Sequence, residues 1–281
     1  MAYLLALSSA ALYGAADFLG GLASRRASAI AIVIVSQAAG LLPLAPLLFL
    51  MPAAPTAQDF IWGMAAGVAG SAGVGLLYRA LAIGTMSIVA PTTAVCAVLI
   101  PAAADVIAGQ QLPPVTIVGM MVAIAAIVLV SQADAAGGRG RRGLPPGIGL
   151  ALLSGVAIGF FFLALARTSA AAGLWPLLAS RGLSIALFTA VALATSRPIG
   201  MTRPVLRVAI ACGMVDMLAN ALYLLASRGG PLSVVVTLAS LYPASTVVLA
   251  RLVMGERLSR RQNVGIACAL VAVLFIVSST P

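Results

Sequence analysis

Two stretches of the chain resemble each other and decide the fold: IAGQQLPPVTIVGMMVAIAAIVLV (107–130) and LVMGERLSRRQNVGIACALVAVLFI (252–276). They align at a shift of about 145 residues, and the same register extends toward the N-terminus. The aligned pairs are Gly109 with Gly255, Leu112 with Leu258, Gly119 with Gly265, Ser9 with Ser154, Gly14 with Gly159 and Tyr78 with Tyr223. We infer that the chain contains two copies of one unit.

The composition is that of a membrane protein. Apolar residues make up 62% of the 281 residues and charged residues 8%, which leaves a soluble globule too little polar surface. Runs such as VGMMVAIAAIVLV are apolar on every face and lack the alternation of a transmembrane β-barrel. Stretches long and apolar enough for a transmembrane helix are predicted at 4–22, 29–51, 60–80, 85–108, 114–132, 147–166, 173–195, 205–226, 231–253 and 263–279.

Five of these spans fall in each copy. An odd number makes the second copy enter the membrane from the opposite side, which is typical of inverted-repeat transporters. We therefore predict an all-α membrane protein with ten transmembrane helices, arranged as two inverted five-helix repeats around a central cavity. The predicted divisions are a first repeat at 1–132, a basic, glycine-rich linker at 133–146 and a second repeat at 147–281.

Local signals mark the span ends. Pro52 and Pro55 close the second span, and Thr56 followed by Asp59 predicts a capping box that begins the third. The first apolar run lacks the basic start and small-residue cleavage site of a secretory signal, so it is predicted to be the first span.

The sixteen arginines give the chain a net charge of +10 and could suggest nucleic-acid binding. Their distribution favours a topology signal instead, because they gather in the loops after odd-numbered spans. These are Arg25, Arg26, Arg79, Arg139, Arg141, Arg142, Arg197, Arg203, Arg207, Arg257, Arg260 and Arg261. Loops after even-numbered spans hold only Arg167 and Arg228. The positive-inside rule then predicts a cytoplasmic arginine-rich side and external termini.

The sequence lacks the residues or motifs of several kinds of catalytic, metal-binding and nucleotide-binding site. The chain has no histidine, and its three cysteines, Cys96, Cys212 and Cys268, lie in predicted spans without CxxC spacing. It also has no P-loop sequence, so direct use of ATP is not expected. We predict no catalytic residues, no metal site and no cofactor, and we expect a protein that is not an enzyme.

Polar residues inside the spans are the candidate binding residues, because intramembrane ionisable groups are costly and usually functional. Asp216, Asn220 and Tyr223 follow helical spacing and form one stripe, and Tyr13 and Asp17 form another. Tyr78, the counterpart of Tyr223, completes the predicted substrate site from the first copy. The aspartates could instead be packing residues that stay neutral or bond to a neighbouring hydroxyl.

Arg181 lies well inside the seventh predicted span. It could bind an anionic group of the substrate, extend its head to the membrane surface, or pair with an aspartate.

Prolines interrupt two predicted spans, Pro91 and Pro101 in the fourth and Pro243 in the ninth. Hydroxyl-bearing neighbours can satisfy the carbonyls that a proline frees, or offer them to a ligand. We predict gating roles for Pro91 and Pro243. The accompanying substrate-binding predictions are Thr92, Thr93, Ser240 and Tyr242. Simple kinks without a ligand role remain the alternative.

The chain resembles the drug/metabolite transporter superfamily, specifically its EamA-type ten-helix members. The resemblance is carried by the doubled pattern, by ALAIGTMSIVAPTTAV (80–95), by residues 226–276 and above all by the run from Gly255 to Leu258. It implies a cavity lined mainly by helices 1, 3, 4, 6, 8 and 9, and export of small metabolites by alternating access. The amino-acid exporters of the YddG type are similar members. Several bacterial relatives have cytoplasmic termini, whereas the arginines here predict external ones.

Two transport functions therefore stay open. The first is export of amino acids or related small metabolites across a bacterial-type inner membrane by a multi-pass protein. The second is efflux of cationic drugs, for which Asp17 or Asp216 would supply charge and Tyr13, Phe160 and Phe161 would supply cation–π attraction. The expected partners are the small-molecule substrate and the lipid bilayer, with no nucleic acid. The sequence favours a monomer without deciding the oligomeric state.

Overall fold

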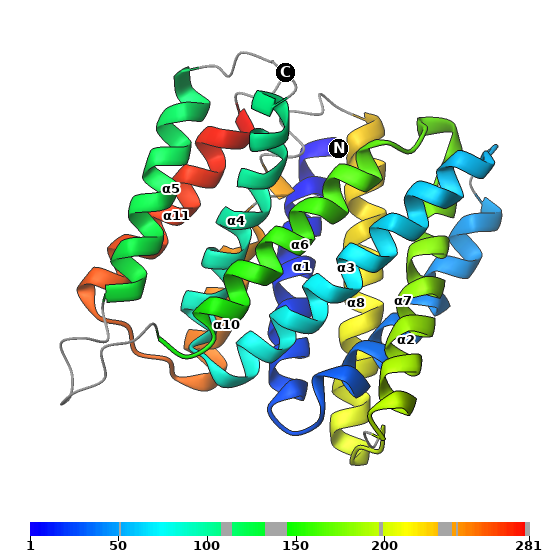
Figure 1. Ribbon diagram of the computed structural model, residues 1–281, viewed down its shortest axis with the longest axis horizontal. Helices are drawn as coiled ribbons and strands as arrows, with labels where there is room; N and C mark the ends of the chain where they lie inside the picture. Colours follow the sequence, from blue (N-terminus) through cyan, green and yellow to red (C-terminus); the bar gives the residue numbers. More distant parts are fainter. Residues whose placement is uncertain are drawn as a thin grey trace.

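The computed structural model describes the chain except residues 51, 108–113, 133–144, 197–198, 230–237, 240 and 279–281. The described part is helical, as predicted (Figure 1). Its α-helices are α1 (Ala2–Ser24), α2 (Ala29–Leu50), α3 (Ala57–Ile83), α4 (Met86–Ile107), α5 (Pro114–Gln132), α6 (Ile148–Ala166), α7 (Trp175–Ala194), α8 (Arg203–Gly229), α10 (Tyr242–Met254) and α11 (Arg260–Ser278), with a short 3-10 helix, η2 (Ala170–Ala172).

Six of these helices are long and apolar enough to cross a membrane. They are α1, α2, α3, α6, α7 and α8, the last over Arg203–Tyr223. Shorter apolar helical segments are found at Met86–Ile100, Tyr242–Met254 and Asn263–Phe275. By length and composition of the described residues, these helices agree with a multi-pass membrane protein.

The capping box that begins α3 is confirmed. The Asp59 backbone N–H donates to Thr56 Oγ1 at 3.3 Å, and Asp59 Oδ2 accepts from the Thr56 N–H at 2.8 Å. The sequence did not predict that Asp59 Oδ1 also accepts from the Ser169 N–H at 2.6 Å. The α2–α3 connection is therefore tied to the α6–α7 connection at this end of the molecule.

The prolines predicted to interrupt two spans take different positions in the described residues. Helix α4 continues from Met86 through Pro91 and Pro101, and α2 continues through Pro43 and Pro46. Pro243 is the second residue of α10, and a proline in the first turn gives up an N–H that has no partner in the helix. The preceding part of the predicted span, 231–253, lies mostly outside the described residues.

The main packing contacts join the two halves of the chain. Helix α1 packs against α8 and α10, α2 against α7 and α8, and α3 against α6 and α7. Helix α4 packs against α6, and α5 packs against α11 at one edge of the molecule (Figure 1). The core therefore lies between the halves rather than inside each one.

Two buried serines fasten this core in the same way. Ser9 Oγ of α1 donates to the Ala219 carbonyl of α8 at 2.8 Å, and Ser154 Oγ of α6 donates to the Gly73 carbonyl of α3 at 2.7 Å. Both serines are fully buried. They are also the pair that the repeat aligned, so aligned residues make equivalent contacts.

The start of α1 and the end of α11 lie on the opposite side of the molecule from the described arginine-rich connections. Figure 1 shows these two helix ends at the upper side, whereas the α1–α2 turn after Arg25 and the starts of α8 and α11 lie at the lower side. We call this lower side the arginine-rich end. The arrangement is the one that the arginine distribution predicted for the described loops.

Candidate functional site

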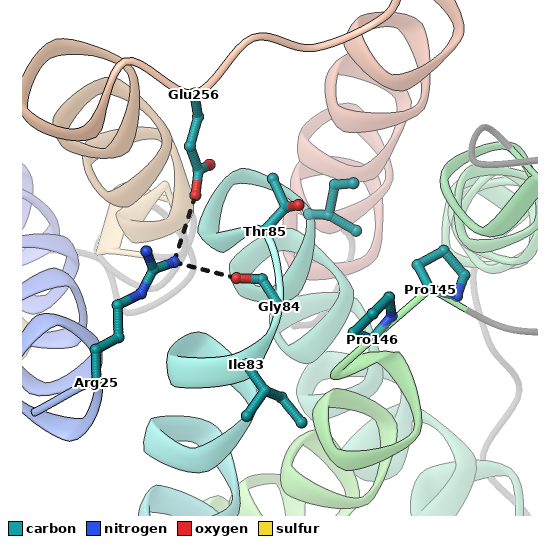
Figure 2. A pocket seen from close by; sticks show the side chains of 8 residues that line it. Arg25, Ile83, Gly84, Thr85, Pro145, Pro146 and Glu256 are labelled. Atoms are coloured by element: carbon teal, nitrogen blue, oxygen red, sulfur yellow. Dashed lines mark hydrogen bonds and ion pairs between the residues drawn. The ribbon is translucent and has the colours of Figure 1, made fainter. Parts of the chain in front are cut away.

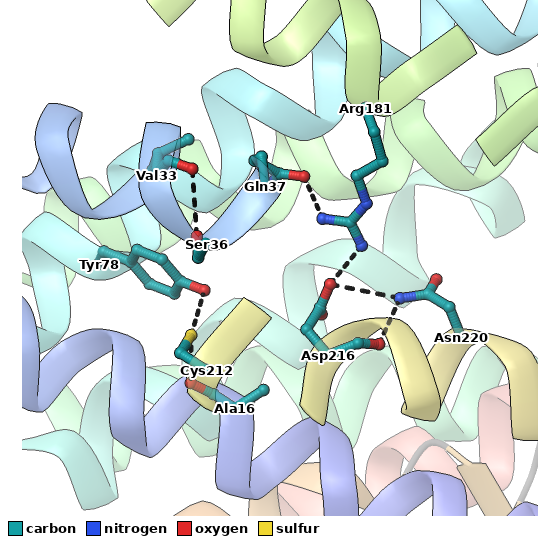
Figure 3. A network of polar contacts seen from close by, with 9 residues as sticks. All are labelled: Ala16, Val33, Ser36, Gln37, Tyr78, Arg181, Cys212, Asp216 and Asn220. Atoms are coloured by element: carbon teal, nitrogen blue, oxygen red, sulfur yellow. Dashed lines mark hydrogen bonds and ion pairs between the residues drawn. The ribbon is translucent and has the colours of Figure 1, made fainter. Parts of the chain in front are cut away.

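A charged cluster lies between three helices at mid-span. The Arg181 guanidinium of α7 donates through Nη1 to Gln37 Oε1 of α2 and through Nη2 to Asp216 Oδ2 of α8 (Figure 3). The side chains of Arg181 and Asp216 are 11% and 24% exposed. Of the three roles considered for Arg181, the structure shows pairing with an aspartate. We call these three residues the charge cluster.

Placing the charges of this cluster away from water costs free energy. Removing one member of a buried ion pair typically destabilises a protein by about 3–5 kcal/mol, because the remaining charge is left without compensation. A charged pair at this depth is also expensive to insert into a membrane. The three residues of the charge cluster satisfy one another's charges and hydrogen bonds where α2, α7 and α8 meet.

Asn220 extends the charge cluster along α8. Its Nδ2–H donates to the Asp216 carbonyl oxygen at 2.8 Å and lies 3.4 Å from Asp216 Oδ2. The predicted stripe on α8 therefore exists at these two residues. Tyr223, its third predicted member, packs against the buried cluster of Ala2, Ala6 and Ala226, and it is close enough to Tyr13 to interact with it electrostatically.

Tyr13 lies beside the charge cluster, and Tyr242 and Asp17 of the predicted site lie next to Tyr13. The Tyr13 and Tyr242 rings meet edge to face with centroids 6.3 Å apart. Tyr13 is also close enough to Asp216, Arg181 and Asp17 to experience their charges. Asp17, one turn further along α1, is half-buried, and its carboxyl group has no hydrogen bond or ion pair among the described residues.

Tyr78 has a packing role in the structure. It is 4% exposed and lies against Gly20, where an added Cβ would come within 2.3 Å of the tyrosine ring. Its hydroxyl lies 3.1 Å from Cys212 Sγ, which in turn lies 3.3 Å from the Ala16 carbonyl (Figure 3). Tyr78 thus joins α3 to α1 and α8 and is separate from the hydrogen bonds of the charge cluster.

The threonines predicted to bind substrate use their hydroxyls on backbone carbonyls. Thr92 Oγ1 donates to the Ile88 carbonyl of its own helix at 2.8 Å. Thr93 Oγ1 donates to the Ala151 carbonyl of α6 at 3.2 Å. Both residues are buried. The carbonyl that Pro91 frees is that of Ser87, four residues earlier, and neither threonine hydroxyl donates to it. Ser240 lies outside the described residues.

A second polar cluster, which the sequence analysis missed, lies at the arginine-rich end. The Glu256 carboxylate accepts from the Met86 N–H at 2.9 Å and from the Ser87 N–H at 3.0 Å, so it caps the first turn of α4. Arg25 Nη2 lies 3.9 Å from Glu256 Oε1 and donates to the Gly84 carbonyl at 3.2 Å (Figure 2). We call this arrangement the α4 latch.

The local sequence explains how Glu256 reaches α4. Gly255 ends α10 with a φ of +65°, a left-handed conformation that favours glycine, and this turns the chain away from the helix. A cavity of about 220 Å³ borders the latch. It is lined by Arg25, Ile83, Gly84, Thr85, Ile88, Pro145, Pro146 and Glu256.

The sequence analysis also missed Gln37, although the apolar residues around it are a signal that it needs a polar partner. It is an isolated amide in the apolar run AIAIVIVSQAAGLL and is 5% exposed in the structure. A buried amide needs a hydrogen-bond partner, which predicts a polar residue on a neighbouring helix. The sequence alone does not indicate that this residue is Arg181.

Comparisons with known proteins agree with this architecture. A model of the EamA-like transporter family matches residues 1–132 and 145–278. A solved crystal structure, 16% identical, shares the fold over 98% of this chain and 95% of its own, with a TM-score of 0.62. No curated protein matches the sequence. The chain therefore belongs to the EamA-like transporter family of the drug/metabolite transporter superfamily, a family of multi-pass membrane transporters of small metabolites rather than enzymes.

Proposed function

We propose that this transporter exports amino acids or related small zwitterions by alternating access, in the manner of the YddG-type exporters. The observation that carries the proposal is the charge cluster, which places one positive and one negative side chain side by side at mid-span. A zwitterion needs both charges compensated once it leaves water. The apolar walls of the surrounding helices would accept side chains of varied size.

The packing supports two inverted repeats, at 1–132 and 147–281, joined by the linker at 133–146. Each helix of the first half has a counterpart in the second half. The pairs are α1 with α6, α2 with α7, α3 with α8, α4 with α10 and α5 with α11. When every helix is replaced by its counterpart, the main helix contacts are reproduced. The contact of α1 with α8, for example, becomes that of α6 with α3. The equivalent hydrogen bonds of Ser9 and Ser154 follow the same exchange. Such a pseudo-twofold relation provides matching gates on opposite sides of the membrane.

The test of the proposed function is transport in proteoliposomes that contain the purified protein. We expect concentration-driven uptake of a labelled apolar amino acid, and no uptake into protein-free liposomes. A quaternary ammonium dye is measured in parallel. Uptake of the dye with none of the amino acid would contradict the proposal and would favour drug efflux.

Asp17 is the observation that favours drug efflux as the second candidate. It is a half-buried carboxyl without a cationic partner among the described residues, close to the Tyr13 ring. The predicted aromatic partners give less support, because Phe160 is 53% exposed and Phe161 lies against Gly70 of α3.

We further propose that the arginine-rich end faces the cytoplasm of a bacterial-type inner membrane, with both termini external. Cysteine at Gly200, in the α7–α8 connection at the arginine-rich end, should resist a membrane-impermeant maleimide in intact cells. Cysteine at Gln58, in the first turn of α3 at the other end, should react. Both positions are exposed, and the wild-type protein gives the background from its own cysteines. The opposite labelling pattern would reverse the orientation.

A further inference from the structure

The charge cluster has a property that follows from its geometry and that rests on the proposed function. We propose that Arg181 and Asp216 form an exchangeable ion pair, into which a zwitterionic substrate inserts. The substrate carboxylate takes Asp216's place on the Arg181 guanidinium, and the substrate ammonium binds the released Asp216 carboxylate. Specificity for zwitterions would then come from these two side chains.

Unused hydrogen-bonding capacity supports the exchange. A guanidinium carries five N–H donors. Among the described residues, Arg181 uses one N–H on Gln37 and one on Asp216. Asp216 Oδ2 accepts from Arg181 and lies within reach of Asn220, whereas Oδ1 has no donor among the described residues. Both partners can therefore begin to bind a substrate before their own contact breaks.

Exposure indicates which member of the pair moves. The Arg181 side chain is 11% exposed and is held by Gln37, which is 5% exposed. The Asp216 side chain is 24% exposed, so it is the more accessible partner. Gln37 is thus a positioning residue, which keeps the guanidinium in place on the α2 side when Asp216 releases it.

Charge balance explains the selectivity. An anionic substrate that displaced Asp216 would leave this carboxylate buried without a counterion, and a cationic substrate would leave Arg181 in the same position. A zwitterion replaces one ion pair with two and leaves neither Arg181 nor Asp216 without a counterion. A singly charged analogue therefore binds poorly for two reasons. It forms one ion pair fewer than a zwitterion, and it leaves either Arg181 or Asp216 without a counterion.

The experiment compares leucine with two singly charged analogues, the cation leucinamide and the anion N-acetylleucine, as uptake substrates in proteoliposomes. Wild-type protein should prefer leucine. Asp216→Asn should shift the ratio of N-acetylleucine to leucine uptake upward by about tenfold or more, because Arg181 is left free for an anion. Arg181→Gln should shift the ratio of leucinamide to leucine upward by a similar factor.

Two further variants complete the test. Arg167→Gln removes an exposed arginine at the end of α6, over the Trp62 ring, and should leave all ratios unchanged. The double variant Arg181→Gln/Asp216→Asn contains no uncompensated charge and should fold where a single variant does not. It should lose the preference for leucine over both analogues.

The outcomes separate the two proposals. Leucine uptake by wild-type protein, with ratios that stay the same in the single and double variants, would overturn the exchangeable pair and leave the proposed function standing. Absence of leucine uptake by the folded wild-type protein would overturn the proposed function and, with it, this inference.

Discussion

Replacing Gly213 with alanine is expected to prevent most of the protein from folding, with a loss of stability of about 3 kcal/mol or more. A Cβ at this position of α8 would lie 1.9 Å from the Ser36 carbonyl oxygen and 2.6 Å from its carbon. These are backbone atoms of α2, so no side chain can rotate away, and the two helices must separate.

The separation would also disturb the charge cluster, because Ser36 adjoins Gln37 and Asp216 follows Gly213 by less than one helical turn. The measurements are the yield of monodisperse protein in detergent and its apparent melting temperature. Gly182→Ala is the matched control, since a Cβ on that glycine of α7 would meet nothing within 4 Å. Equal behaviour of the two variants would show that α2 and α8 can adjust their spacing freely.

Apolar run lengths were sufficient to predict where most of the described helices lie. The predicted span at 29–51 corresponds to α2, and the span at 173–195 corresponds to α7, because helix formation in an apolar chain satisfies the backbone locally. Helix boundaries that depend on proline were predicted less well. Pro243 lies at a helix start rather than inside a helix, and nothing in its immediate sequence distinguishes the two positions.

The candidate site was predicted only in part, because its contacts join residues that are distant in sequence. Arg181, Asp216 and Asn220 could be selected as polar residues in apolar spans. Which of them meet depends on helix packing, and Gln37 lies 144 residues from its partner Arg181. Tyr78 illustrates the opposite case, since an aromatic residue with a polar tip satisfies the same sequence pattern in a core as in a binding site.

The α4 latch could not be predicted from the sequence for a similar reason. The sequence singles out Glu256 as part of a family pattern, but its contact with Met86 spans 170 residues. Only the folded chain shows that a carboxylate from the second half of the chain caps a helix of the first. A contact of this kind between the halves is a candidate gate under the alternating-access proposal.

Replacing Glu256 with alanine is expected to shift the transporter toward conformations that are open at the arginine-rich end. The substitution removes two charge-assisted hydrogen bonds to the start of α4 and the ion pair with Arg25. We expect a shift of about 2 kcal/mol, or roughly thirtyfold in the equilibrium between conformations, because such bonds contribute about 1.5–3 kcal/mol each and water replaces part of this on opening.

Cysteine at Thr85, which lines the cavity beside the latch, reports the change. Its maleimide labelling in proteoliposomes should become much faster in the Glu256→Ala background. Substrate turnover should fall, because the arginine-rich end closes more slowly in each transport cycle. Glu256→Gln keeps one acceptor oxygen and should give an intermediate rate. Asp59→Ala, which breaks the contact at the opposite end, should not accelerate labelling at Thr85, so it separates opening of one end from general destabilisation. Unchanged labelling and turnover in Glu256→Ala would show that the carboxylate only caps α4 and that the gate lies elsewhere.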